Sequence, residues 1–278
     1  MQRYDDRTAP SPRPDAAQAD PARPSRPLEG RTALVTGASR GIGRAIAQRL
    51  ATDGALVAVH YNTNESAAQE TADLITKNGG QAFTLHAPLG VPDDAETLFR
   101  RYDQALTQLG RPAVLDILVN NAGLNIRGTI TDTTPQDFDH LIAVLAKAPL
   151  FLVQQALPRL RPHGRIINIS SAATRVALPT ALAYTMAKAA LEGLTHTLAP
   201  TLAPRNITVN AITPGYTRTD LNHHRWDTPE KEAVHAAQSP FNRIGDPGDI
   251  ADIAAFLASD ASRWITGQTI DASGGVGL

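Results

Sequence analysis

From residue 31 onward, short β-rich runs of the chain alternate with amphipathic helical stretches. Seven such runs occur, and they read RTALVTG, ALVAVHY, QAFTLHA, LDILVNNAG, GRIINISS, NITVNAI and GQTIDASGG. Parallel neighbouring strands need a crossover connection, which a helix between two strands provides. The alternation therefore predicts an α/β fold with a doubly wound, parallel, seven-stranded sheet in a single domain. Right-handed crossovers would bring the carboxyl ends of the strands to one edge, where a ligand should lie.

The stretches between these runs predict the helices. We expect helices over about 41–53, 64–78 and 92–109, a helical hairpin across about 135–160, and a helix that carries Tyr184 and Lys188. Near the C-terminus, Phe256 and Trp264 are expected in the core, because large aromatic side chains are highly buried on average.

Residues 1–28 differ in composition from the rest of the chain. They hold six prolines and almost no large apolar side chain. Such a segment cannot compensate its ordering entropy by burying apolar surface. We therefore expect a disordered, proline-rich leader at 1–28 and one domain at 29–278. A transit peptide is a weaker alternative, because such peptides are poor in acids and this segment has several aspartates.

Charge and composition exclude several classes of function. The formal net charge of -1 gives no basis for attraction to nucleic acid or to a membrane surface. No apolar run approaches the roughly 20 residues that span a bilayer. The chain has no cysteine, which excludes disulfides, thiolate metal sites and a cysteine nucleophile. The adjacent histidines His223 and His224 lack a third ligand at helical spacing, so we expect no metal. A cytoplasmic protein with small-molecule partners is the default expectation.

The first β-rich run ends in TGASRGIG, with Gly37, Gly41 and Gly43 at the entrance to a helix. Glycines there let the backbone approach a pyrophosphate, and the helix N-terminus offers N–H donors and partial positive charge. A tight turn that needs glycine only for steric reasons is the alternative. The position after the first strand of an alternating β/α chain favours a dinucleotide site.

The end of the second run indicates which dinucleotide binds. That run ends HYNTN at 60–64, with no carboxylate before Glu65, whereas an NAD site usually has an acid there for the ribose hydroxyls. Arg40, inside the glycine turn, would lie close to a 2′-phosphate, although a solvated surface arginine is the alternative. We therefore expect NADP(H). The candidate cofactor-binding residues of this half are Gly37, Ser39, Arg40, Gly41, Ile42, Gly43, Tyr61 and Asn62.

Tyr184 and Lys188 stand four residues apart, which places them on one face of a helix. A phenol with a pKa of about 10 transfers protons poorly near neutral pH, and a neighbouring ammonium would lower that pKa. Ser171 ends the run GRIINISS, so its hydroxyl would point into the ligand crevice, where it can hydrogen-bond a carbonyl. By itself, Tyr-x-x-x-Lys is common and would indicate two amphipathic surface residues.

Taken with TGASRGIG and with NNAG at 120–123, this arrangement resembles the short-chain dehydrogenase/reductase family, in its 3-oxoacyl-reductase-like branch. The resemblance covers about residues 29–278 and implies a Rossmann-type fold. It implies that Tyr184 is the general acid or base. It also implies that Lys188 holds the nicotinamide ribose and lowers the pKa of the Tyr184 phenol. Ser171 polarises the carbonyl, whereas Ser170, facing the other way, is structural. The further cofactor residues implied are Asn120, Ala122, Gly123, Pro214, Gly215 and Thr219.

The resemblance also implies an activity and an assembly. It implies an NADP(H)-dependent ketoreductase or alcohol dehydrogenase that transfers hydride between nicotinamide and a carbonyl or secondary alcohol, as a homotetramer. A polar stretch at about 216–243 would form a substrate lid. Arg127, Arg175, His224 and Arg225 would favour an anionic or carrier-linked substrate, or else they are solvated surface cations.

Two positions depart from the family pattern. Leu145 stands where the family carries a catalytic asparagine, and Pro88 stands where it often has an aspartate for the adenine. Leucine can neither donate nor accept a hydrogen bond, so the family's proton relay is in question. Imine reduction or non-redox chemistry at the same site is therefore one alternative. A cofactor-binding protein without turnover is another, which the intact Ser171, Tyr184 and Lys188 argue against.

Overall fold

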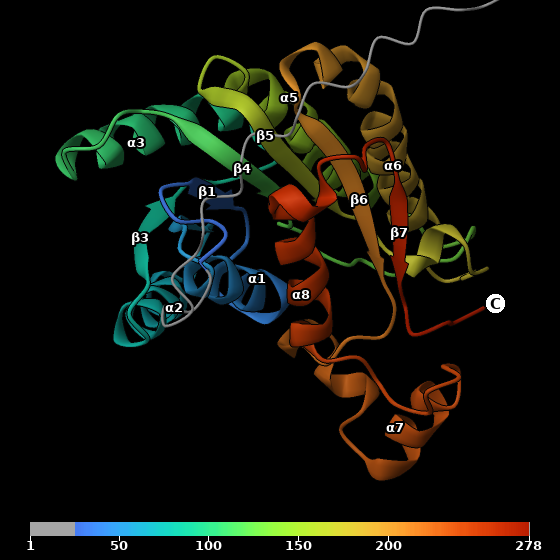
Figure 1. The fold of residues 1–278 in the computed structure, drawn as a ribbon. Coiled ribbons are helices and arrows are strands. Elements are labelled where there is room, and N and C mark those ends of the chain that lie inside the picture. The colour runs from blue at the N-terminus through green and yellow to red at the C-terminus, as the bar shows by residue number, and fades with distance from the viewer. Residues whose placement is uncertain (1–25, 278) are drawn as a thin grey trace, which may run out of the picture.

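The computed structural model describes residues 26–277, so nearly all of the leader expected at 1–28 lies outside the described residues. Within them, one parallel sheet has the strand order β3-β2-β1-β4-β5-β6-β7 (Figure 1). The strands are β1 (Thr32–Val35), β2 (Leu56–Tyr61), β3 (Gln81–His86), β4 (Leu115–Asn120), β5 (Leu160–Ile169), β6 (Thr208–Pro214) and β7 (Thr269–Ala272). The order reverses between β1 and β4, as in a doubly wound sheet. The predicted fold class and the seven strands are confirmed.

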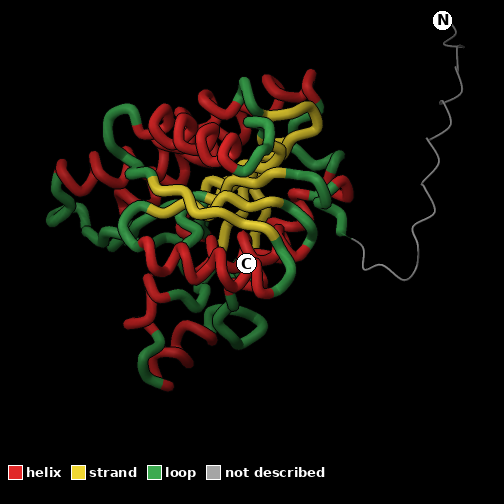
Figure 2. Tube along the Cα trace, turned by 90° about the vertical axis from the view of Figure 1, so that its left-hand side faces the viewer, coloured by secondary structure: helices red, strands yellow, loops and turns green. Residues whose placement is uncertain are grey.

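Helices cover both faces of this sheet (Figure 2). On one face lie α1 (Gly41–Thr52), α2 (Glu65–Lys77) and α8 (Pro247–Ala258), and on the other lie α3 (Asp94–Gln108), α5 (Ala148–Ala156) and α6 (Leu182–Leu202). Successive residues of β1 show how the strands serve both layers. Ala33 and Val35 pack with α1 and α8, whereas Leu34 packs with α3 and α5. Strands buried on both faces explain why these runs are almost wholly apolar.

The helical hairpin expected across about 135–160 is wrong. Residues 135–156 form α4 (Pro135–Ile142), a π-helical turn at Ala143–Lys147 and α5 without reversing direction, and β5 begins at Leu160. No glycine interrupts this stretch, so nothing in the sequence forces a reversal. The π-helical turn lies just before Pro149, which has no N–H to give to the carbonyl of Leu145 four residues earlier.

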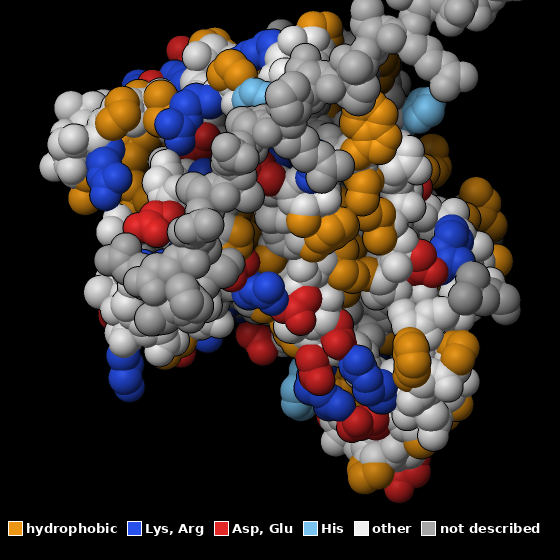
Figure 3. All heavy atoms as spheres, in the orientation of Figure 1, with side chains coloured by type: hydrophobic (Ala, Val, Ile, Leu, Met, Phe, Trp, Pro, Cys, Tyr) orange, Lys and Arg blue, Asp and Glu red, His pale blue; other side chains and the backbone are white. Residues whose placement is uncertain are grey.

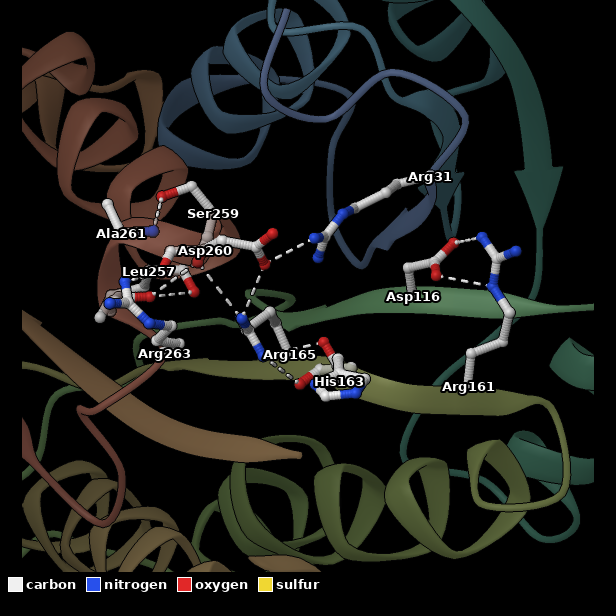
Figure 4. A network of polar contacts seen from close by, with 12 residues as sticks. Arg31, Asp116, Arg161, His163, Arg165, Leu257, Ser259, Asp260, Ala261 and Arg263 are labelled. Carbon is white, nitrogen blue, oxygen red and sulfur yellow. Dashed lines mark hydrogen bonds and ion pairs between the residues drawn. The ribbon is translucent and has the colours of Figure 1, made fainter. Parts of the chain in front are cut away.

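Charged residues are paired at the edge where the strands begin (Figure 4). The Arg165 side chain is 2% exposed and donates to Asp260 and to three main-chain carbonyls. Arg31 donates to the same carboxylate at 2.6 Å, and Arg161 forms a two-bonded pair with Asp116. Each of these charges has a partner, so they connect the strand starts to neighbouring segments of the fold.

Leu28 belongs to the folded domain although it was expected in the leader. It is fully buried against α1 and α8, and its N–H donates to the carbonyl of Asp53. The domain therefore begins a few residues before 29, because this single large apolar side chain finds a place in the core.

Phe256 and Trp264 were expected in the core, and this expectation is wrong. Their exposed fractions are 41% and 97%. The inner side of α8 is formed by the residues that are buried there, and Phe256 lies on its outer side. The buried residues are Ile250, Ala251, Ala254, Ala255, Leu257 and Ala258. Figure 3 shows hydrophobic side chains gathered on this face, near the C-terminal end of α8 and β7.

Between residues 26 and 277, no helix is both long enough and apolar enough to cross a bilayer.

Candidate active site

A cavity opens at the edge where the strands end, and it collects most of the predicted site. Its walls come from the glycine turn before α1, the loop after β4, the end of β5, α6 and the segment after β6. The predicted residues that line it are Arg40, Gly41, Ile42, Gly43, Ser171, Tyr184, Lys188, Pro214, Gly215 and Thr219. Residues separated by up to 179 positions in the chain, from Arg40 to Thr219, thus meet at one place.

Other predicted cofactor residues do not line this cavity. They are Gly37, Ser39, Tyr61, Asn62, Asn120, Ala122 and Gly123. The side chain of Asn120 is buried and donates to Asn168 of β5 at 2.8 Å, so it joins two strands. Gly37 packs directly on Ala122, since a Cβ at Gly37 would lie 2.8 Å from the Ala122 Cα. Gly37 and Ala122 therefore shape the glycine turn by packing on each other outside the cavity.

The glycine turn leaves the start of α1 open to an anion. Gly37 and Gly41 have φ of +63° and +56°, which side chains rarely adopt. Arg40 caps α1 without a side-chain hydrogen bond, and the first turn of α1 has no acidic residue. The N–H groups and partial positive charge of this helix end are thus uncompensated within the described chain. These features fit a bound pyrophosphate.

His60 holds the glycine turn in place, and sequence reasoning missed it. Its Nδ1 accepts the N–H of Gly37 at 3.0 Å, and its Nε2 lies 2.9 Å from the carbonyl of Ala87 after β3. Complete burial lowers the pKa of His60 from 6.5 to about 4, so the ring is neutral at pH 7 and can serve one donor and one acceptor. The sequence feature that could have identified His60 is the presence of a histidine inside the apolar run ALVAVHY.

Asn121 was also missed, although it stands inside the NNAG motif. It lines the cavity, and its side-chain amide donates to the carbonyls of Thr36 and Gly37. Thr36 in turn accepts the main-chain N–H of Asn121 through its hydroxyl at 2.9 Å. The second asparagine of the motif therefore ties the loop after β4 to the glycine turn.

Helix α6 carries Tyr184 and Lys188 one turn apart, opposite the end of β5. The Lys188 ammonium lies 5.9 Å from the centre of the Tyr184 ring and donates to the carbonyl of Ile169 at 2.7 Å. The Ser171 hydroxyl lies near enough to the Tyr184 phenol to lower its pKa. The structure thus brings the three predicted catalytic side chains together.

The electrostatics of this trio differ from the expectation. Lys188 was expected to lower the pKa of Tyr184, but burial raises that pKa above 10, and only Ser171 and Arg127 oppose the rise. The Lys188 ammonium points toward the Ile169 carbonyl instead, and burial lowers its own pKa to about 8, with Glu192 opposing. Tyr184 is therefore a protonated phenol at neutral pH.

Glu192 connects the two elements that carry the trio. It stands one helical turn after Lys188 on α6, and its Oε1 accepts the hydroxyls of Ser170 at 2.6 Å and Thr174 at 2.9 Å. These two residues flank Ser171 at the end of β5. The hydroxyl of Ser170 thus holds the strand end through Glu192, as a structural residue would, although Ser170 also lines the cavity beside Ser171.

Leu145 packs in an apolar cluster beside the trio. It is 1% exposed and lies with Leu141, Val144 and Ala187, with Tyr184 packed against the same cluster. An asparagine side chain at 145 would enter this apolar cluster, where polar partners are few. Pro88, the other departure, follows Ala87, whose carbonyl contacts His60.

The four cations expected near a substrate separate into two groups. Arg175 forms an ion pair with Asp271 at 2.7 Å and also donates to Val276, so it fastens the C-terminal segment. His224 is exposed and does not line the cavity. Arg127 and Arg225 do line it.

Comparisons with known proteins agree with this geometry. A family model described as enoyl-(acyl carrier protein) reductase matches residues 37–277. The hydroxynaphthalene reductase-like protein Arp2 of Metarhizium majus is 38% identical over 262 residues, covering 90% of this chain and 96% of that protein. The promiscuous reductase LugOII, which catalyses keto-reduction at C1 during lugdunomycin biosynthesis, is 50% identical with a TM-score of 0.88, covering 91% of this chain and 100% of that structure.

A second solved structure is similar to the same degree. The angucycline C-6 ketoreductase LanV with bound NADP is 50% identical with a TM-score of 0.86, covering 90% of this chain and 96% of that structure. The residues matched by the family model include the glycine turn, the strand ends and the Tyr184 helix. The chain therefore belongs to the short-chain dehydrogenase/reductase family.

Proposed function

We propose that this protein reduces a ketone on a fused-ring, phenol-bearing substrate, with Tyr184 as the proton donor. As a member of its family it is an NADP(H)-dependent oxidoreductase that acts on carbonyl compounds. The observation that carries the assignment is the meeting of Ser171, Tyr184 and Lys188 with the glycine turn in one cavity. The fused-ring substrate is inferred from the relatives, which include a hydroxynaphthalene reductase-like protein and an angucycline ketoreductase. Apolar walls at Val176, Leu178 and Leu221 support it.

Different residues of the chain have different roles in the reduction. NADPH, when bound at the glycine turn and Lys188, supplies the hydride. The Ser171 hydroxyl hydrogen-bonds the substrate carbonyl oxygen and holds it beside the phenol. Tyr184 then donates its proton to that oxygen as negative charge develops on it. Burial raises the pKa of Tyr184, so the phenol holds this proton at neutral pH.

The activity is tested by following NADPH consumption with purified protein. The panel contains bicyclic and tricyclic ketones, β-ketoacyl thioesters, quinones and cyclic imines. We expect the fused-ring ketones to be consumed fastest. Preference for imines or for thioesters would reject the proposed substrate class, and tight NADPH binding with no consumption on any carbonyl would reject the proposed reduction.

Replacing Arg40 with alanine is expected to weaken NADPH binding by about tenfold to a hundredfold, because one charge-assisted contact is worth about 1.5–3 kcal/mol. Arg40 lines the cavity at the glycine turn and has no side-chain partner among the described residues. NADH lacks the 2′-phosphate, so its affinity should change little. Dissociation constants for both cofactors, measured by fluorescence titration, check this. Equal losses for both would contradict a 2′-phosphate contact.

Glu192 is expected to act as a positioning residue. Glu192→Leu removes one of two acceptors from each of the Ser170 and Thr174 hydroxyls, which should cost about 1 kcal/mol of unfolding free energy for each lost hydrogen bond. Glu192→Gln keeps an acceptor oxygen but removes the charge that raises the pKa of Lys188. We therefore expect Gln to retain most of the stability and to shift the Lys188 limb of the pH profile of kcat/KM to lower pH. An unmoved pH profile in Glu192→Gln would leave Glu192 a purely structural role.

The homotetramer, the cytoplasmic location and the lid at about 216–243 stay predictions. Exposed apolar side chains support an assembly: Leu150 and Phe151 on α5, Met186 on α6, and Phe256 with Trp264 near β7. The lid segment contains a 3-10 helix at Asp220–Arg225 and α7 (Pro229–Ala236), and its first part lines the cavity. Figure 1 shows α7 projecting beyond the ends of the strands, as a lid over the substrate would.

A further inference from the structure

Two arginines from different segments line the substrate end of the cavity. Arg127 lies in the loop between β4 and α4, and Arg225 is the last residue of the 3-10 helix after β6. The Arg225 guanidinium lies 5.8 Å from the centre of the Tyr216 ring, which lines the same cavity. Arg127 is close enough to Tyr184 for its charge to affect the phenol. Arg127 therefore stands beside the reacting end of the site, and Arg225 lies beside Tyr216 in the same cavity.

Neither arginine has a partner of opposite charge between residues 26 and 277. No carboxylate lies within ion-pairing distance of either, and neither side chain donates a hydrogen bond. Asp220 also lines the cavity but pairs with neither. By contrast, two neighbouring arginines that lie outside the cavity are paired: Arg175 with Asp271 and Arg218 with Glu232. Of these four arginines, the two without an ion-pair partner are thus the two that line the cavity.

The two positive charges also act on each other. Partial desolvation against the cavity wall is the main cause that lowers the pKa of Arg127, and the charge of Arg225 is the second. The phenols of Tyr216 and Tyr184 oppose this effect only weakly. Like charges that converge on an apolar-walled pocket are unfavourable unless an anion lies between them. Guanidinium groups are suited to bind oxyanions through paired N–H donors.

We infer that Arg127 and Arg225 together bind an oxyanion of the substrate, a carboxylate or an ionised enol or phenol, and so select acidic fused-ring ketones. This inference rests on the proposed function, because it assigns the substrate class of the same cavity. The cofactor's 2′-phosphate is a different anion, and it is assigned to Arg40 at the glycine turn. The anion subsite lies on the Tyr184 and Tyr216 side of the cavity.

Equilibrium binding to the NADP⁺-bound protein tests the inference without requiring turnover. Two matched pairs of probes are used: 2-naphthoate with its methyl ester, and 2-hydroxy-1,4-naphthoquinone, an acidic enol, with its methyl ether. The variants are Arg127→Gln, Arg225→Gln and, as a matched control, Arg218→Gln, which removes a paired arginine from the same segment outside the cavity. The readout is the ratio of anion affinity to neutral-probe affinity for each pair.

We expect the wild type to prefer at least one anion over its neutral partner by about tenfold or more. Each cavity variant should reduce that ratio by about tenfold, and Arg218→Gln should leave it unchanged. The pair that responds identifies carboxylate or enolate as the ligand. A wild type without preference for either anion, or equal losses for anion and neutral probe, would overturn the inference.

The same proteins separate this inference from the proposed function. If the anion preference is found but no ketone consumes NADPH, the subsite stands and the proposed reduction fails. If neutral ketones are reduced by wild type but neither anion is preferred, the reduction stands and the subsite is rejected. Added NaCl should weaken the anions more than the neutral probes, since it screens the two guanidinium groups.

Discussion

Replacing Tyr184 with phenylalanine is expected to lower kcat for ketone reduction by about 100-fold to 10,000-fold, because general acid catalysis by a positioned group contributes on that order. The ring remains, so its packing beside Leu145 and Lys188 is retained. Only the hydroxyl, with its proton and its contact to Ser171, is lost. Binding of NADPH should therefore persist.

The measurement is NADPH consumption under saturating ketone, together with a fluorescence titration of NADPH. Turnover that survives undiminished would exclude Tyr184 as the proton donor. Loss of both turnover and cofactor binding would mean that the phenol is needed for the structure of the cofactor site. That result would contradict a role in proton transfer alone.

Replacing Gly43 with alanine is expected to weaken NADPH binding by more than about 100-fold and to destabilise the fold. A Cβ at Gly43 would lie 2.9 Å from the carbonyl carbon of Gly37 and would clash with its oxygen and with the Asn121 amide. These atoms belong to the turn and to the loop that lines the cavity, so the turn must open. Overpacking of this kind typically costs about 1–3 kcal/mol of unfolding free energy.

Gly193→Ala is the matched control, because a Cβ there has no atom within 4 Å and the residue lies inside α6. Alanine should stabilise that helix by up to about 1 kcal/mol and leave NADPH affinity unchanged. Thermal unfolding and cofactor titration of both variants provide the comparison. A Gly43→Ala protein with normal cofactor affinity would show that the turn does not need the close backbone approach.

Much of the fold and of the reacting trio follows from local features of the sequence. Strand periodicity, helix spacing and the Gly37–Gly43 turn depend on contacts between near neighbours, and the topology of a parallel sheet then places Ser171 opposite Tyr184. The relation of Tyr184 to Lys188 is a property of one helix. These features were predicted because few long-range contacts decide them.

Other properties depend on what surrounds a side chain in three dimensions. His60 and Glu192 acquire their roles from partners on other elements, and Arg127 and Arg225 differ from Arg175 only because no carboxylate reaches them.

The sequence by itself determined the parallel α/β sheet, the glycine turn and the Ser171, Tyr184 and Lys188 trio. Only the tertiary structure decided that Tyr184 has a raised pKa, that Leu28 is buried and Trp264 exposed, and that Arg127 and Arg225 share one cavity. The physical reason is that burial and charge act through space, so desolvation and Coulomb energies depend on neighbours that are remote in the chain.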